Sequence, residues 1–280
     1  MTKKVYPTRK LLASLVLLAS KSLMLNLKTK LKQMKRPKFG RFSKGENIMW
    51  NGKLKAVTFS FDDAVLQDKR TIDILNKYNL KATFNLNSAY LGFKDEYKAN
   101  GRTIRRDKFL PTQVKDIYKG HEVAVHTMVH AFLPDLEDDI VTWQVEQDRK
   151  MLSNLVGYEV VGMAYPCGGV NNDDRVAAVI KNTTGVKYAR TTVSTYNFDE
   201  QENLFRFNPT VYYCEVEKMF ELAEKFINLK TDKPQIFYIW GHTYELDAGV
   251  IDWEKFEELC KLISNKEDIF YGTNTEVLVK

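Results

Sequence analysis

The feature that most limits the fold of this chain is an alternation of strand-like and helix-like segments that repeats from Lys55 onward. The expected strands are short and largely apolar, and the segments between them carry apolar residues at helical spacing. Strands are expected at 55–61, 81–86, 122–125, 160–165, 186–189, 236–240 and 269–271, and helices at 66–79, 112–119, 135–156, 172–182, 215–229 and 252–264. This alternation predicts an α/β fold with a parallel sheet covered by helices.

The length of the alternating region distinguishes between two such folds. One uninterrupted run of about 230 residues favours a single (β/α) barrel, with a doubly wound open sheet as the alternative. Helix 135–156 has acidic residues in its first turn, where the helix dipole favours them, and its apolar residues keep roughly helical spacing: Leu136, Ile140, Trp143, Leu152 and Leu155. Helix 172–182 is expected to be capped by Asn171 or Asn172.

The net charge of +6 combines two unlike parts of the chain. Residues 1–46 hold ten Lys and three Arg against one acid, a charge of +12, so the remaining 234 residues carry −6. The charge shift divides the chain into a basic extension, 1–46, and one domain, 47–280. Because the domain is mildly acidic, we expect no nucleic-acid partner.

The basic extension contains an apolar run at 11–20 that follows several basic residues, as in a secretory signal. Lys21 interrupts the run, which is too short to span a bilayer. A weak signal or anchor, a segment lying on an anionic membrane surface, and a disordered arm all fit this pattern. The expected location is accordingly cytoplasmic or at a bacterial cell surface, with membrane contact through residues 1–46.

Chemistry-bearing side chains stand at the carboxyl ends of three expected strands: Asp62 and Asp63 after the first, His126 and His130 after the third, and His242 after the sixth. In parallel α/β folds these ends share one face, where active sites collect. The sequence therefore predicts that two carboxylates and three imidazoles, far apart in the chain, converge.

Such a set matches the needs of a catalytic metal site. A divalent ion with open positions takes two or three N and O ligands, lowers the pKa of a bound water and polarises a carbonyl. On one helical turn His126 and His130 would face the same way, and one Asp would add an anionic ligand. The second carboxylate would accept a proton from water, and a His on the opposite side would protonate the leaving group. These parts predict hydrolysis of an amide or an ester.

Each element alone also has a simpler interpretation. An Asp-Asp pair is commonly a helix N-cap, two His four residues apart commonly lie on a surface, and His242 could be a core residue bound by a carbonyl. Their coincidence at strand ends favours the active site. His121, which follows Gly120 before a strand, is expected to be a structural turn residue.

These residues resemble the motifs of the polysaccharide deacetylases of the NodB-homology type, carbohydrate esterase family four. The run S-F-D-D ending at Asp63 is similar to the family's T-F-D-D, the run H-T-M-V-H from His126 to its H-[ST]-x-x-H, and I-W-G-H ending at His242 to its final motif. The resemblance spans roughly residues 50–275. It implies a distorted (β/α)7 barrel, a divalent metal ion, usually zinc, and deacetylation of a carbohydrate polymer, most often one of N-acetylglucosamine.

The resemblance also implies roles for single residues. Asp62 would be the general base, His242 the general acid, and the metal ligands would be Asp63, His126 and His130.

The family's third motif, R-x-P-Y, is altered here to A-Y-P-C, from Ala164 to Cys167. The Arg that would orient the base is absent, and Arg190 at the end of another expected strand is a candidate replacement. Cys167 can still donate its backbone N–H to an oxyanion. Tyr165 and Trp240 are further candidates for oxyanion or substrate contacts.

The family's fourth motif is not evident, and Asp247 or an acid near Asp199 is the candidate to support His242. These departures bear on the substrate more than on hydrolysis. We expect a metal-dependent hydrolase that removes acetyl groups from a carbohydrate. The alternatives are a hydrolase of a small non-peptide amide and a non-catalytic carbohydrate-binding barrel.

Overall fold

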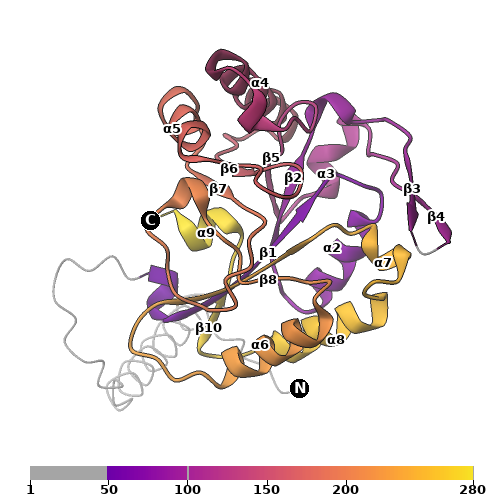
Figure 1. Cartoon of the computed structure of the whole chain (residues 1–280). Coiled ribbons are helices and arrows are strands. Elements are labelled where there is room, and N and C mark those ends of the chain that lie inside the picture. The colour runs from indigo at the N-terminus through magenta and orange to yellow at the C-terminus, as the bar shows by residue number, and fades with distance from the viewer. Residues whose placement is uncertain (1–48, 100, 280) are drawn as a thin grey trace, which may run out of the picture. The chain divides into compact units, whose positions relative to one another are not determined.

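The computed structural model describes residues 49–99 and 101–279, which form one compact unit (Figure 1). The basic extension 1–46 and its apolar run 11–20 lie outside the described residues, so the expectations for them stay predictions. Within the described part, no helix combines the length and the apolar character needed to cross a membrane.

The described residues form the following elements. The strands are β1 (Lys55–Asp62), β2 (Ala82–Leu86), β3 (Glu96–Ala99), β4 (Arg102–Arg105), β5 (Glu122–Val125), β6 (Gly162–Ala164), β7 (Tyr188–Arg190), β8 (Val211–Tyr212), β9 (Gln235–Gly241) and β10 (Ile269–Tyr271). The α-helices are α2 (Asp68–Lys77), α3 (Val114–Ile117), α4 (Asp138–Val156), α5 (Asp174–Thr183), α6 (Val216–Asn228), α7 (Glu245–Ala248), α8 (Trp253–Ile263) and α9 (Asn274–Leu278). Short 3-10 helices are η1 (Met49–Gly52), η2 (Ser88–Tyr90), η3 (Pro111–Gln113), η4 (Leu133–Asp135) and η5 (Leu204–Arg206).

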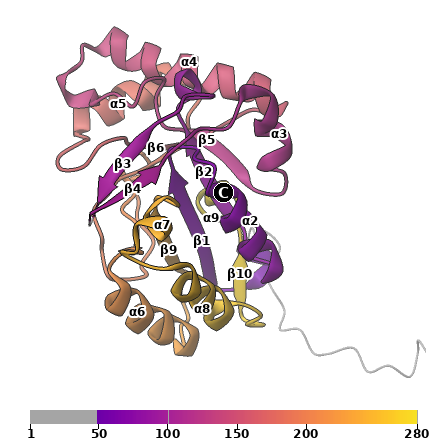
Figure 2. The same cartoon turned by 90° about the vertical axis from the view of Figure 1, so that its right-hand side faces the viewer.

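A parallel sheet in the order β7-β6-β5-β2-β1-β9-β8 forms the centre of the molecule, and β10 pairs with the start of β1. The segment 207–212 connects the β7 edge of the sheet with β9. Phe207 at its start bridges to Arg190 of β7, and β8 at its end pairs with β9. The helices lie outside the strands, with α4 and α5 on one side and α6 and α8 on the other (Figures 1 and 2). This curled sheet confirms the expected distorted (β/α)7 barrel.

Strand β1 is the centre of this barrel, and all eight of its residues are buried. Its two aromatic rings, Phe59 and Phe61, both pack edge-on against Phe256 of α8. A strand that is buried along its whole length needs cover on both faces of the sheet, and each fully buried Phe contributes about 1.5–3 kcal/mol. The core thereby fixes the carboxyl end of β1, where Asp62 and Asp63 lie.

Helix α4 turns only part of the expected apolar face to the core: Leu152 is buried and Leu155 packs against the core, as expected. Ile140 and Trp143 are 44% and 49% exposed. Two polar residues on the buried face bind the backbone of the turn at 126–130. Gln144 accepts a hydrogen bond from the Val129 N–H, and Asp148 accepts one from the His126 N–H. Because these two polar residues point inward, the apolar pattern of the sequence does not identify the whole buried face of α4.

The expected cap of helix α5 was also wrong. The Asp173 carboxylate accepts the Val176 N–H at 2.7 Å and caps the helix. Asn171 instead donates to the carbonyl oxygens of Pro166 and Cys167 and folds the loop after β6.

The antiparallel hairpin β3–β4 was not predicted. It lies outside the barrel and near α7 (Figure 2). Because charged residues interrupt its apolar alternation, the sequence gives little strand signal there.

Candidate active site

A pocket of about 220 Å³ opens at the carboxyl ends of the barrel strands. All five side chains expected to converge line this pocket, together with residues from neighbouring loops. Its lining comprises Asp62, Asp63, Arg106, His126, His130, Tyr165, Cys167, Gly168, Thr192, Trp240, His242 and Tyr244. The predicted convergence is therefore present in the structure.

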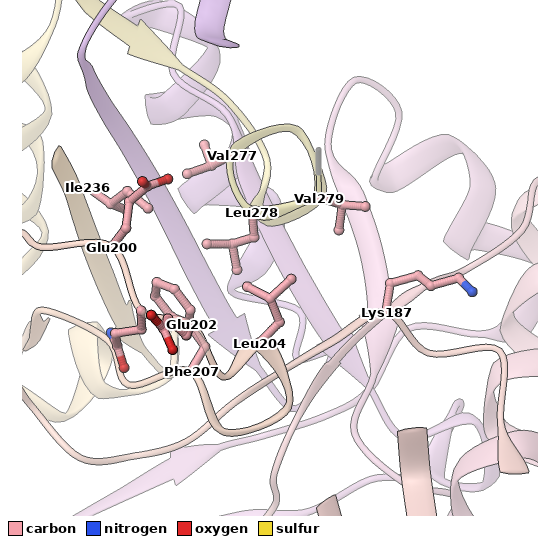
Figure 3. A pocket seen from close by; sticks show the side chains of 10 residues that line it. Lys187, Glu200, Glu202, Leu204, Phe207, Ile236, Val277, Leu278 and Val279 are labelled. Carbon is pink, nitrogen blue, oxygen red and sulfur yellow. The ribbon is translucent and has the colours of Figure 1, made fainter. Parts of the chain in front are cut away.

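A larger pocket, of about 680 Å³, lies elsewhere and is shown in Figure 3. Its wall is mostly apolar, with Leu204, Phe207 and Val277 beside the carboxylates of Glu200 and Glu202. It brings together no imidazole, so the smaller pocket is the better candidate for hydrolytic chemistry.

Three of the converging side chains form a possible metal-binding triad. The ligand atoms of Asp63, His126 and His130 all lie within 4.8 Å of one another. The Asp63 Oδ1 atom lies 4.0 Å from His126 Nε2 and 3.8 Å from His130 Nε2. Two imidazole nitrogens and one carboxylate fit a divalent ion such as zinc and leave positions open for other ligands.

The backbone that carries these ligands is not helical, contrary to the helical turn expected for residues 126–130. These residues form a turn, in which Thr127 and His130 take positive φ angles of 61° and 53°. The turn brings the rings of His126 and His130 to a centroid distance of 5.0 Å. Asp63 is also left-handed, with a φ of 84°. Such conformations are uncommon for residues other than glycine and concentrate at functional sites.

Neighbouring groups fix the orientation of His126. Its Nδ1 lies 2.9 Å from the Ala164 carbonyl oxygen, a contact that assigns the proton to Nδ1 and leaves the Nε2 lone pair directed at Asp63. Asp148 accepts the backbone N–H of the same residue. Burial lowers the pKa of His126 to about 4, so its ring is neutral at neutral pH, as a metal ligand must be.

Asp62 is held by a buried guanidinium. Arg190, with 0% side-chain exposure, donates from Nη2 to both carboxylate oxygens at 2.6 Å, and Asn85 donates to Oδ1 at 2.8 Å. Burial alone would raise the pKa of Asp62, but the charges of Arg190 and of the nearby imidazoles outweigh it and lower the pKa. Arg190 thus lies where an Arg that orients the base is needed, and its burial excludes contact with a substrate.

His242 faces Asp62 across the pocket, with its Nε2 atom 3.9 Å from Asp62 Oδ2. Its partner is Glu245, whose carboxylate lies 3.2 Å from Nδ1 and accepts the His242 backbone N–H at 3.0 Å. Burial alone would lower the pKa of His242, but Glu245 and the two Asp residues outweigh it and raise it to about 9.

The acids expected to support His242 lie elsewhere. Asp247 binds Gln67 and Trp253, and Asp199 binds Lys233. The sequence signal that could have identified Glu245 is its position three residues after His242, at the start of a helix.

The remaining predicted contact residues differ in their surroundings. Trp240 is 7% exposed, stacks on Tyr212 and lies 4.5 Å from the Arg190 guanidinium. Tyr165 is fully buried, and its hydroxyl donates to the Phe205 carbonyl, so this hydroxyl is not available to a substrate. The Cys167 Sγ atom lies 3.6 Å from the Nδ1 atom of the ligand His130.

His121 has the structural role expected for it. Its Nδ1 accepts the Ala82 N–H at 3.2 Å, and its Nε2 lies 3.1 Å from the Asn76 side chain. It precedes β5, whereas the pocket lies beyond the carboxyl end of that strand.

The pocket therefore has two functional halves. Asp63, His126 and His130 can hold a divalent ion. Asp62 is a charged carboxylate that can accept a proton, and His242 is an imidazolium that can donate one. Together they can hydrolyse an acyl group bound between them.

Comparison with known proteins agrees with this fold. Residues 51–188 match the family model described as polysaccharide deacetylase. No curated protein gives a match. Among solved structures, the Xyl-CE4 domain of a multidomain xylanase, from the hindgut metagenome of Trinervitermes trinervoides, is 16% identical. The match covers 80% of this chain and 89% of that chain, with a TM-score of 0.50.

Two further structures match over 53% of this chain. A polysaccharide deacetylase from Bacillus cereus is 18% identical with a TM-score of 0.43, and a Streptococcus pyogenes deacetylase in complex with acetate is 21% identical with a TM-score of 0.44. The matches span 44% and 61% of those two chains. The likeness to the xylanase domain, at 16% identity and a TM-score of 0.50, concerns the fold alone.

Proposed function

We propose that this chain is a metal-dependent hydrolase that removes acetyl groups from a carbohydrate, since residues 51–188 match the family model described as polysaccharide deacetylase. The observation that carries the proposal is the pairing of a possible metal-binding triad with a separate base and acid in one pocket. A carboxylate and an imidazole on opposite sides of a reacting carbonyl are the groups that hydrolysis needs.

Asp63, His126 and His130 would hold the ion, and zinc fits their ligand types best. A bound divalent ion supplies Lewis-acid polarisation of a carbonyl and lowers the pKa of water. Lys108 donates to the Asp63 backbone carbonyl at 2.6 Å, which holds this ligand in its left-handed conformation.

Proton transfers are assigned to the other half of the pocket. Asp62, kept charged by Arg190, accepts a proton from the water that attacks the acetyl carbon. His242, kept protonated by Glu245, donates a proton to the leaving amine or alcohol as the bond to the acetyl carbon breaks. The products are acetate and the free amino or hydroxyl group. The Cys167 N–H is our candidate donor to the oxyanion.

As the substrate we propose an N-acetylglucosamine-type glycan, in line with the polysaccharide deacetylase model that residues 51–188 match. A volume of about 220 Å³ is smaller than that of most ligand sites, which span about 300–1,000 Å³. It suits one acetamido group, with the rest of a glycan chain outside the pocket. Trp240 and Tyr244 supply aromatic surface in the lining.

The test is acetate release by the purified full-length protein from a panel of acetylated glycans, with and without a chelator. We expect release from an N-acetylglucosamine oligomer, its loss with chelator, and its return with added zinc. Absence of acetate release from every glycan, with zinc bound, would contradict the proposal.

The small pocket also favours a second candidate, a hydrolase of a small amide. The same residues would act, and the altered segment from Ala164 to Cys167 would belong to a different substrate. Activity on small amides without activity on oligomers decides for this candidate. Glycan binding without turnover, in protein that holds the ion, decides for a carbohydrate-binding barrel.

A further inference from the structure

The β3–β4 hairpin gives the mouth of the pocket an unusual charge. Residues 93–109 contain six basic and three acidic side chains, whereas the domain as a whole carries −6. The hairpin is anchored next to the site, because Leu66 donates its N–H to the Asp107 carbonyl and Lys108 donates to the Asp63 carbonyl. The residues that follow β4 are thereby held next to Asp63, one of the possible metal ligands.

Arg106 is the hairpin residue that lines the pocket. Its guanidinium lies 5.2 Å from the ring centroids of both Tyr97 and Tyr244, and Nη2 donates to the Asp95 carboxylate. Tyr244 in turn packs against His242 with a centroid distance of 5.2 Å. The side chain of Arg106 is 25% exposed, and its Nε has no hydrogen-bond partner among the described residues. Because Nε is itself buried, only the exposed part of the guanidinium can reach a ligand, and Arg106 is thus a preorganised, partly exposed cation beside the acid of the site.

The charges near the mouth favour one kind of ligand. Arg190 already pairs with Asp62, and Glu245 pairs with His242. A divalent ion beside Asp63, together with Arg106 and Lys108 against Asp95, would therefore leave this side of the pocket positively charged. Asp95 is 43% exposed, so its ion pair with Arg106 is partly solvated and weak. A planar guanidinium fits a carboxylate, and a carboxylate would offset part of this positive charge.

We propose that Arg106 is a specificity-determining residue that binds a carboxylate on the substrate, so that the chain acts on an acidic acetylated sugar. This inference rests on the proposed deacetylase function and deepens it. The carboxylate belongs to the acetylated ring itself, as a lactyl ether, or to a neighbouring uronic acid. In both cases it lies outside the acetyl pocket, on the side of Tyr244 and the hairpin.

The test compares each acid with its own methyl ester, which keeps the shape and removes the charge. One probe pair is an N-acetylglucosamine oligosaccharide with a 3-O-lactyl group, and the other is an acetylated oligosaccharide that contains a uronic acid. For wild-type protein we expect kcat/KM for one acid to exceed that for its ester by about tenfold or more. In Arg106→Gln this ratio falls by about tenfold or more. Arg106→Lys keeps the charge but loses the paired N–H donors of the guanidinium, so it retains part of the preference for the acid over its ester.

Arg102→Gln is the matched control, because it removes a basic residue of the same hairpin that does not line the pocket. It should keep the wild-type ratio. Equal rates for acid and ester in wild-type protein, or a ratio unchanged by Arg106→Gln, would overturn the inference.

Calorimetric binding of the same probes separates this inference from the proposed function. If no glycan is hydrolysed but the acid binds more tightly than its ester in an Arg106-dependent way, the carboxylate site stands and the deacetylase proposal does not. Equal binding of acid and ester refutes the carboxylate site regardless of turnover. Arg106→Lys supplies the same comparison if Arg106→Gln does not fold.

Discussion

The two halves of the pocket are held in place by different kinds of contacts. On the metal-ligand side, His126 is fixed by the Ala164 carbonyl and by Asp148 at its backbone N–H, and left-handed backbone turns aim the ligands. On the acid–base side, each functional group is paired with a charged side chain, Asp62 with Arg190 and His242 with Glu245. Hydrogen bonds to the backbone and left-handed turns hold the first half, and ion pairs between side chains hold the second.

This difference follows from the charge that each half must carry. An imidazole ligand binds an ion in its neutral form, so it can be buried with only a backbone partner. A base that stays ionised in a buried place needs a countercharge, and an acid that stays protonated needs a carboxylate. Changes on the first side should therefore remove the ion, and changes on the second should alter proton transfer or stability while the ion stays bound.

The largest effect is expected for His126→Ala. Loss of the nitrogen ligand should abolish ion binding, and with it activity should fall by about four orders of magnitude or more. The measurement is the metal content of the purified variant together with its rate of acetate release. His121→Ala, at a histidine that precedes β5, is the control and should keep its metal. A variant of His126 that holds stoichiometric metal would show that the ligand assignment is wrong.

Asp62→Asn should separate the two halves. The amide keeps the size of the side chain but cannot accept a proton from water, so turnover should fall by about 10²–10⁴-fold with metal content unchanged. Metal analysis and steady-state kinetics on the same sample check both parts. Near-normal turnover would refute the assignment of Asp62 as base, and lost metal would mean that the two halves are not separate.

Arg190→Met should act mainly on stability. It leaves the Asp62 carboxylate buried without its countercharge, which typically costs about 3–5 kcal/mol in the free energy of unfolding. Urea unfolding at neutral pH measures this loss. Because Asp62 has a lowered pKa in the folded protein, its ion pair stabilises above the ordinary pKa of 3.8 and is lost as the pH falls through the folded value.

The cost of Arg190→Met should therefore shrink in acid. The double variant Arg190→Met with Asp62→Asn should recover part of the loss at neutral pH, since no charge is then left unpaired. Equal stability of wild type and the single variant would contradict the structural role of the pair.

The two halves also show which parts of the site could be predicted from the sequence and which could not. The parallel sheet covered by helices and the strand-end positions of Asp62, Asp63 and His242 follow from alternation alone, because parallel strands present their carboxyl ends on one face. The partners Arg190 and Glu245 are harder to predict. Arg190 is 128 positions away from Asp62, and only the pairing of β7 with the rest of the sheet brings it near.

Local backbone conformation was the second feature that the sequence did not predict. The spacing of His126 and His130 fits one helical turn, but the chain makes a left-handed turn instead, and tertiary hydrogen bonds to Asn87 hold it. The hairpin that carries Arg106 was missed for a related reason. Its strands are short and charged, and neighbouring loops stabilise it more than its own apolar pattern does.

The smallest effect, and the finest test of the comparison, is expected for Glu245→Gln. The amide can still hydrogen-bond His242 but carries no charge, so the pKa of His242 should fall from about 9. Because the acid must be protonated to act, the alkaline limb of kcat/KM should move to lower pH, with about a tenfold loss on that limb. Asp247→Asn, two residues further on α7 and bound to Gln67, should leave the limb in place.

The same variant makes a prediction about stability in the ion-free protein. A His with a raised pKa stabilises the fold below its unfolded pKa of 6.5, and this contribution is lost as the pH rises through about 9. Wild-type stability should therefore decline between these values, and the decline should be smaller in Glu245→Gln. If both proteins lose stability equally over this range, Glu245 does not set the charge of His242, and the acid–base half would then be held by backbone contacts, as the metal-ligand half is.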